Sequence, residues 1–295
     1  MPGLPTKHRT ILVTGALGQI GSELVPALRD RYGHERVIAS DLRMTPPGTP
    51  AAAGRHEHLD CTDFQQLLDI VRRHDIGTIY HLAALLSATA EAKPQVAWSL
   101  NTGSLYNVLE VARQYQCAVF FPSSIGAFGP TTPRDRTPQV TIQRPTTIYG
   151  VTKVAGELLA DYYVHRFGVD ARGLRLPGLI SYVAPAGGGT TDYAVDIFHQ
   201  ALRYAHYTCF LGSDTRLDMM YMPDAIRAII GLMEADPARL QHRNAYNVTS
   251  MSVTPDDIAG EIRRHIPSFA IDYHVDPLRQ AIADSWPRSL DDHAA

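Results

Sequence analysis

Tyr149 and Lys153 are the residues of this chain whose types and spacing best suit acid–base chemistry. They stand four residues apart, and the run 151–160 reads as a helix, so both side chains should lie on one helix face. A phenol ionises near pH ~10, too high for a base in neutral water. An ammonium group one turn away favours the phenolate and lowers that pKa toward neutrality. The pair predicts a general base, although a surface lysine beside a half-buried tyrosine has the same spacing.

Ser124 is expected to join this pair from the end of a buried strand. The apolar run 118–124 reads as a parallel strand that delivers Ser123 and Ser124 at its carboxyl end. Ligands of open parallel sheets bind beyond these strand ends. Ser124 precedes Tyr149 by 25 residues, which allows a loop to return the tyrosine to face the serine. The serine and the Tyr-x-x-x-Lys spacing together are more specific than either alone.

A glycine-rich turn near the N-terminus predicts a dinucleotide site. The β-branched strand 10–14 runs into Gly15, Gly18 and Gly21, and a helix is expected at 22–30. Glycines at this spacing permit a tight turn, close approach to a pyrophosphate and close packing of helix on strand. The helix N-terminus then supplies amide donors and a positive dipole for the phosphates.

Asp41 indicates which dinucleotide binds. It closes a second strand, 36–40, about 20 residues after the glycines, where a carboxylate accepts hydrogen bonds from the adenosine ribose. A carboxylate at this place repels a 2′-phosphate, which favours NAD over NADP. Arg43 is the one dissenting residue, because a nearby arginine can accommodate that phosphate.

Further strands and one helix complete the expected cofactor site. Strands are expected at 58–61, 77–84 and 171–178, and a helix that opens at Asn101 is expected to pack under the site. Small residues at the end of the fourth strand leave room for a cofactor that lies across it. The residues expected to contact NAD are Gly15, Leu17, Gly18, Gln19, Ile20, Gly21, Asp41, Leu42, Arg43, Asp60, Cys61, Leu82, Ala83, Ala84, Asn101, Tyr149, Lys153 and Leu176.

The order of these elements predicts an α/β fold: a Rossmann-type doubly wound parallel sheet with a smaller C-terminal α/β lobe that binds substrate. We expect an NAD-binding domain at 1–177, rejoined by part of 215–250, and a substrate-binding lobe that is mainly 178–295.

Composition argues against several other classes of protein. The 27 Lys and Arg against 30 Asp and Glu give a net charge of −3, which lacks the basic surface of a nucleic-acid-binding protein. No apolar run approaches a membrane span, and residues 1–9 lack the apolar stretch of a signal peptide. Cys61, Cys117 and Cys209 are sparse and far apart, which suits a reduced cytoplasm and argues against a disulfide framework or a metal site.

These motifs resemble those of the extended short-chain dehydrogenase/reductase family. The resemblance rests on the glycine turn, Asp41, Ser124 and the Tyr149–Lys153 pair. Three longer strings, at 15–21, 123–130 and 188–194, are similar to the NAD-dependent L-threonine 3-dehydrogenase branch of that family, and the likeness covers nearly the whole chain. The chain ends at Ala295, where this branch is expected to continue with a further short tail.

The resemblance implies oxidation of the 3-hydroxyl of L-threonine to 2-amino-3-oxobutanoate, with hydride transfer to NAD. It implies that Tyr149 takes the hydroxyl proton, that Lys153 lowers the pKa of Tyr149 and holds the nicotinamide ribose, and that Ser124 orients the reacting oxygen. For the carboxylate and ammonium of the substrate we expect a clamp of Ser87, Thr190 and Thr191. The glycines at 187–189 are expected to let that segment close, and Trp286 is a further candidate for the wall.

Two other functions compete with this interpretation. A nucleotide-sugar epimerase or dehydratase shares fold, cofactor and the Ser-Tyr-Lys residues, and needs cations such as Arg203, Arg216 or Arg227 for a second pyrophosphate. A non-catalytic NAD-binding sensor tends to lose the tyrosine or the lysine, and both are present here. The resemblance also implies a homodimer through the two helices that begin near Asn101 and Tyr149.

Overall fold

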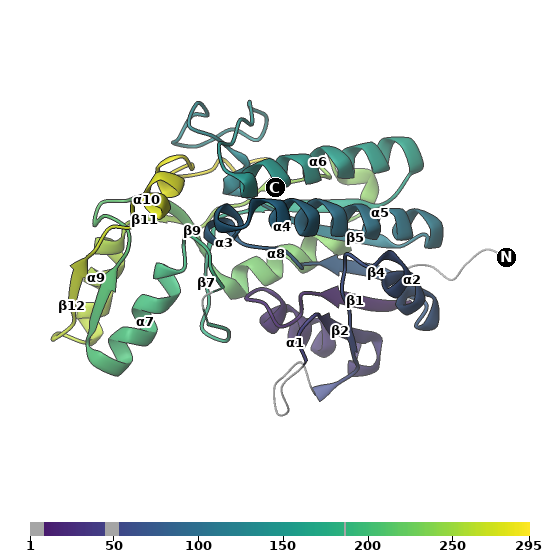
Figure 1. The fold of residues 1–295 in the computed structure, drawn as a ribbon, viewed down its shortest axis with the longest axis horizontal. Helices are drawn as coiled ribbons and strands as arrows, with labels where there is room; N and C mark the ends of the chain where they lie inside the picture. Colours follow the sequence, from purple (N-terminus) through teal and green to yellow (C-terminus); the bar gives the residue numbers. More distant parts are fainter. Residues whose placement is uncertain (1–8, 45–52, 186) are drawn as a thin grey trace.

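The computed structural model describes residues 9–44, 53–185 and 187–295 and contains a seven-stranded parallel sheet (Figure 1). The sheet order is β10-β6-β5-β4-β1-β2-β3, so the chain starts in the middle and winds outward in both directions. The strands are β1 (Thr10–Thr14), β2 (Val37–Asp41), β3 (His56–His58), β4 (Ile76–His81), β5 (Ala118–Ser124), β6 (Ala171–Leu176) and β10 (Tyr246–Asn247). The predicted doubly wound Rossmann-type sheet is confirmed.

Helices cover both faces of this sheet, as its apolar strands require. On one face, α1 (Gly21–Tyr32) and α8 (Met222–Glu234) bury Leu24, Leu28 and Ile229 in a shared apolar core. On the other face lie α2 (Phe64–Arg73), α5 (Ser104–Tyr115) and α6 (Ile148–Phe167). Two layers of helix thus hold the strand ends in one row, which is where the predicted site residues stand.

A smaller lobe lies beside the carboxyl ends of the strands, on the left in Figure 1. Its two sheets have the orders β11-β9-β7 and β12-β8. Its elements are β7 (Gly178–Ile180), α7 (Tyr193–Tyr204), β8 (His206–Cys209), β9 (Leu217–Tyr221), β11 (Met251–Val253), α9 (Pro255–His265), β12 (Ala270–Tyr273) and α10 (Pro277–Asp284). Between β9 and β11 the chain returns to the large sheet to add β10, which pairs with β6.

Three predicted strands differ from the observed ones, and the one expected at 77–84 ends at His81. The strand expected at 171–178 divides, because Pro177 has no N–H to continue the ladder of β6; Gly178 starts β7 and pairs with β9 instead. The strand expected at 58–61 ends at His58, and Leu59 to Cys61 turn into the site.

Short helical segments link the larger elements. They are η2 (His34–Arg36), α3 (Ser87–Ala92), α4 (Pro94–Trp98), η4 (Ser99–Gly103), η5 (Ile125–Ala127) and η6 (Pro237–Arg239). The helix expected to open at Asn101 instead includes Asn101 in η4, one turn of π-helix that continues into α5. Such turns are frequent at functional sites.

In the described part of the chain, we find no helix with the length and apolar character needed to span a bilayer. The N-terminal residues used to argue against a signal peptide lie, up to His8, outside the described residues.

Candidate active site

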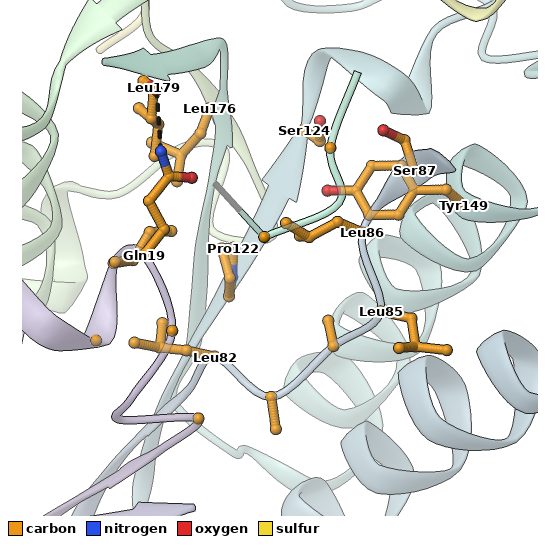
Figure 2. A pocket seen from close by; sticks show the side chains of 18 of the residues that line it. Gln19, Leu82, Leu85, Leu86, Ser87, Pro122, Ser124, Tyr149, Leu176 and Leu179 are labelled. Atoms are coloured by element: carbon orange, nitrogen blue, oxygen red, sulfur yellow. Dashed lines mark hydrogen bonds between the residues drawn. The ribbon is translucent and has the colours of Figure 1, made fainter. Parts of the chain in front are cut away.

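A cavity of about 460 Å³ opens at the carboxyl ends of β1, β2, β4, β5 and β6. Figure 2 shows the Tyr149 ring beside Ser124 and Ser87 on one side of it and Gln19 on the opposite side. Most of the predicted site residues line this single cavity: Gly15, Gly18, Gln19, Ile20, Gly21, Asp41, Leu42, Arg43, Asp60, Cys61, Leu82, Ala83, Ala84, Ser87, Ser124, Tyr149, Lys153, Leu176, Thr191 and Trp286.

Three predicted contact residues, Leu17, Asn101 and Thr190, lie outside the wall of this cavity. The Leu17 amide donates to Asp41 Oδ2 over 3.0 Å, so Leu17 acts through its backbone. The Asn101 side chain accepts from the Leu85 amide at 2.8 Å and donates to the Leu85 carbonyl at 3.1 Å. Asn101 therefore holds the loop between β4 and α3, and its contact with the cofactor stays a prediction.

Thr190 is fully buried behind Ser87. Its hydroxyl lies 2.9 Å from Ser87 Oγ, and its amide donates to that same oxygen over 3.0 Å. Thr190 thus fixes the Ser87 hydroxyl, and Thr191 is the residue of the pair that faces the cavity. The prediction that Thr190 itself contacts substrate is not supported by this geometry.

The glycine turn forms a cradle that only glycine fits. Gly15 has a φ of +66°, and a Cβ built on it would come within 2.8 Å of the Ala83 amide nitrogen. A Cβ on Gly21 would come within 2.5 Å of the Gly15 carbonyl oxygen. The glycines therefore let the turn pack closely against the end of β4 and against the start of α1, and this holds the N-terminus of α1 at the cavity, where it suits a pyrophosphate.

Asp41 ends β2 on the wall of the same cavity. It accepts from the Leu17 amide and, at 3.0 Å, from the Arg43 amide and Arg43 Nε. Burial alone would raise the pKa of Asp41, but the hydrogen bonds from Arg43 and Leu17 outweigh it and the pKa falls. Asp41 is an anion here, and the ion pair occupies the arginine that could have received a 2′-phosphate. The site fits NAD.

Ser124, Tyr149 and Lys153 meet at the end of β5. Thr147 caps the N-terminus of α6 and places Tyr149 in its first turn, beside Gly126. A Cβ on Gly126 would lie 3.0 Å from the Tyr149 ring, so the glycine allows the ring its position. Lys153 follows one turn later and donates from Nζ to the Pro122 carbonyl over 2.7 Å. The three side chains that were predicted from their spacing therefore lie together on one wall of the cavity.

Burial acts on the two ionisable groups in opposite directions. It raises the pKa of Tyr149, and a hydrogen bond with Ser124 only partly opposes the rise. It lowers the pKa of Lys153 to about 8, and the negative charge of Glu157 opposes that shift. The prediction that Lys153 brings the pKa of Tyr149 below its ordinary value is wrong for this structure, because the ammonium binds the Pro122 carbonyl and the phenol is desolvated.

The substrate side of the cavity contains residues that the sequence did not single out. Asp192 lines the cavity, and its Oδ2 accepts from the amides of Gly188 and Gly189 at 2.7 and 2.8 Å. An Asp directly before a helix reads as an ordinary cap, but its place after the glycine run was an available signal. Trp286 is also on the wall, and its Nε1 has no hydrogen-bond partner among the described residues.

Gln19 bonds to residues far away along the chain, so no local sequence pattern predicts the contact. Its side-chain amide donates to the Leu179 carbonyl at 3.1 Å and to Ser181 Oγ at 3.0 Å (Figure 2, Leu179 bond drawn). The glycine turn of the large sheet is thereby tied to the strand that leads into the substrate side. Five leucines that the sequence did not identify as site residues also line the cavity: Leu59, Leu85, Leu86, Leu100 and Leu179.

Fold and site together define an NAD-dependent oxidoreductase, and comparison with known proteins agrees. The model of the NAD dependent epimerase/dehydratase family matches residues 11–249. The chain belongs to that family, and the resemblance predicted from the motifs is confirmed at this level.

Individual relatives are similar over almost the whole chain. An uncharacterized epimerase/dehydratase of Staphylococcus saprophyticus is 55% identical over 283 residues, which cover 96% of this chain and 88% of the relative. The structure of L-threonine dehydrogenase from Clostridium difficile is 55% identical with a TM-score of 0.93, covering 97% of this chain and 90% of that one. A monomeric L-threonine 3-dehydrogenase from a metagenome is 45% identical, with a TM-score of 0.93 and coverage of 96% and 90%.

Proposed function

We propose that the protein oxidises the 3-hydroxyl of L-threonine to 2-amino-3-oxobutanoate and transfers the hydride to NAD. The observation that carries the proposal is the meeting of Ser124, Tyr149 and Lys153 on the wall of the cavity that also contains the glycine turn and Asp41. The similarity to L-threonine dehydrogenase structures over almost the whole chain supports threonine as the substrate.

In this reaction, Tyr149 accepts the proton of the substrate hydroxyl while the hydrogen on C3 leaves as hydride. Ser124 donates a hydrogen bond to the same oxygen, which orients it and stabilises the charge that develops there. The oxidised nicotinamide of NAD supplies the hydride acceptor and a positive charge that favours the phenolate. Lys153, one helical turn from Tyr149, keeps a positive charge beside Tyr149 and Ser124.

Four side chains on the substrate side suit a small zwitterionic amino acid. Asp192 Oδ2 binds two backbone amides, and we assign the other oxygen of this carboxylate, on the cavity wall, to the ammonium. Trp286 Nε1 is a buried donor without a partner among the described residues, and we assign it to the carboxylate. Two hydroxyls lie on the same wall, that of Thr191 and that of Ser87, which Thr190 holds in place.

The nucleotide-sugar alternative needs cations for a second pyrophosphate, and the proposed arginines lie elsewhere. Arg203, Arg216 and Arg227 are absent from the described wall of the cavity. Arg216 instead donates to the Ser252 carbonyl at 2.7 Å, and Arg227 pairs with Asp224 on the surface of α8. The positive side chains on the described wall are Arg43, which pairs with Asp41, and Lys153. This distribution favours a small zwitterion over a nucleotide sugar.

The test is NADH formation by the purified protein with NAD or NADP and a panel of L-threonine, D-threonine, L-serine and UDP-sugars. We expect absorbance to rise with L-threonine and NAD. Tyr149→Phe should abolish it, and Tyr204→Phe, an exposed tyrosine on α7, should not change it. Interconversion of a UDP-sugar without oxidation of threonine would move the protein to the epimerases. NAD binding without either reaction would indicate a sensor.

We also infer a cytoplasmic homodimer. Tyr106 of α5 and Leu158 and Tyr162 of α6 expose apolar surface on neighbouring helices, with more than half of each side chain accessible. A second copy of the same two helices would cover it as a four-helix bundle. The three cysteines are free and buried, as suits a reducing compartment. Because one similar enzyme is monomeric, light scattering on the eluted protein decides the matter, and a mass near 32.5 kDa contradicts the dimer.

A further inference from the structure

Glu157 is a buried carboxylate that the proposed reaction does not use. Its Oε1 accepts from Ser123 Oγ and, at 3.0 Å, from Arg175 Nε. Its Oε2 accepts from Arg175 at 2.7 Å and from Gln143 at 3.0 Å. Glu157 is 1% exposed and Arg175 6%. Four hydrogen bonds, two of them from the bidentate Arg175, hold this carboxylate in one orientation.

The strand register explains why these groups converge. Ser123 of β5 lies opposite Arg175 of β6, and Arg175 lies opposite Asn247 of β10. Arg175 also donates to Asn247 Oδ1 over 3.2 Å. Three polar side chains therefore form one row across three strands, against the helix that carries Glu157. The adjacent position along β5 is Ser124, which faces the cavity.

Glu157 also stands one helical turn beyond Lys153. Residues four apart on a helix have neighbouring side chains. The other groups around the Lys153 ammonium are the Pro122 carbonyl, the Phe121 and Tyr149 rings, with centroids 4.8 and 5.3 Å away, and the buried His81. Burial lowers the pKa of His81 to about 3, so it is neutral at every pH of interest. Glu157 is the anion among these neighbours.

We propose that Glu157 is a positioning residue of the active site: it joins the Ser123–Ser124 end of β5 to α6 and supplies the negative charge that the Lys153 ammonium faces. Arg175 holds this carboxylate and reduces its effect on Lys153. The role in catalysis rests on the proposed function, but the charge relation does not. Burial pulls Lys153 toward the neutral amine, and the carboxylate opposes that pull.

Removing the charge of Glu157 or that of Arg175 should shift the pKa of Lys153 in a defined direction. Opposite charges on residues one helical turn apart in a partly screened interior interact strongly enough to shift a pKa by about one unit or more. Glu157→Gln removes the anion and should lower the pKa of Lys153 by about one unit. Arg175→Gln removes the competing cation and should raise it. The double variant E157Q/R175Q loses both charges and should titrate close to the wild-type protein.

The chain has three lysines, Lys7, Lys93 and Lys153, which makes a direct measurement possible. Protein labelled with ¹³Cε-lysine gives one signal for each, and substitution of Lys7 and Lys93 assigns them. The chemical shift of the Lys153 signal is followed from pH 6 to pH ~10.5 in each variant, with far-ultraviolet circular dichroism to confirm folding. Asp161→Asn, two turns further along α6, is the matched control and should leave the Lys153 titration unchanged.

Opposite shifts in E157Q and R175Q, with the double variant returned toward wild type, establish the proposal. Unchanged titration in a folded E157Q, or shifts of the same sign in both single variants, overturns it. If E157Q does not fold, an upward shift in R175Q supports the proposal, and no shift or a downward one refutes it. Because this titration needs no substrate, failure of the protein to oxidise threonine leaves the result readable and counts against the proposed function alone.

Discussion

Asp218 should make the protein less stable as the pH rises. This side chain of β9 is fully buried, and it accepts from Thr249 Oγ1 at 2.6 Å and from the Leu290 amide at 2.8 Å. Burial raises its pKa to about 7, against hydrogen bonds that lower it, and the charge of Asp292 adds to the rise. Asp218 thereby fastens the segment that follows Trp286, in a form that retains its proton to unusually high pH.

The direction of this change in stability follows from proton binding by Asp218 in the folded and unfolded states. The unfolded chain loses the Asp218 proton near its ordinary value of 3.8, and the folded protein keeps it until about pH 7. The folded state therefore binds more protons in that interval, and its stability falls as the pH rises through it. Between pH 5 and pH 8 this group should cost about 3 kcal/mol of unfolding free energy, an order-of-magnitude figure.

The perturbation is Asp218→Asn, which removes the titration but keeps the bonds. The amide oxygen can accept from Leu290, and the amide nitrogen can donate to Thr249, whose hydroxyl can reverse its role. Urea unfolding at pH 5 and pH 8 measures both proteins. The variant should gain about 3 kcal/mol relative to wild type between these two pH values. A stability difference between wild type and variant that is the same at both pH values would refute the assignment.

Three further variants test the cofactor and substrate sides. Gly15→Ala places a Cβ 2.8 Å from the Ala83 nitrogen at a φ of +66° and should weaken NAD binding at least ~10-fold by titration of tryptophan fluorescence, because such backbone strain costs about 1–3 kcal/mol. Gln19→Leu removes the bonds to Leu179 and Ser181 and should speed NADH release several-fold in stopped-flow measurements; an unchanged rate would show that this bridge does not limit release. Trp286→Phe keeps an aromatic side chain, although a smaller one, and loses the Nε1 donor, so KM for threonine should rise about 5–20-fold at nearly constant kcat. A fall in kcat alone would contradict its assignment to the carboxylate.

Features set by short-range spacing were predictable from the sequence. The strand and glycine turn before Ser22 form as expected because their conformations are determined within a few residues. Tyr149 and Lys153 share a helix face by periodicity, and the β5 strand end was bounded correctly at Ser124. Parallel topology then brings distant strand ends to one edge, so local patterns were enough to assemble most of the cavity wall.

The remaining features depend on contacts between distant parts of the chain. Thr190 and Thr191 are neighbours of the same type, and which one faces the cavity is decided by the bond of Thr190 to Ser87. Asn101 was expected beside the cofactor, but its amide is taken up by Leu85. Trp286 gave no periodic signal in a polar tail, and it reaches the wall because the C-terminal segment folds back onto the smaller lobe. No single-sequence pattern encodes such pairings.

The pair at the centre of the site shows why burial alone cannot make a base. Desolvation drives Tyr149 toward the neutral phenol and Lys153 toward the neutral amine, and neither form serves the proposed reaction. A positive charge entering the cavity lowers both pKa values, so it helps the phenolate and works against the ammonium. Coulombic effects weaken with distance. Glu157, one turn from Lys153 and two from Tyr149, therefore stabilises the ammonium more than it opposes the phenolate. Ser124 acts on the other member of the pair, through its hydrogen bond to the phenol.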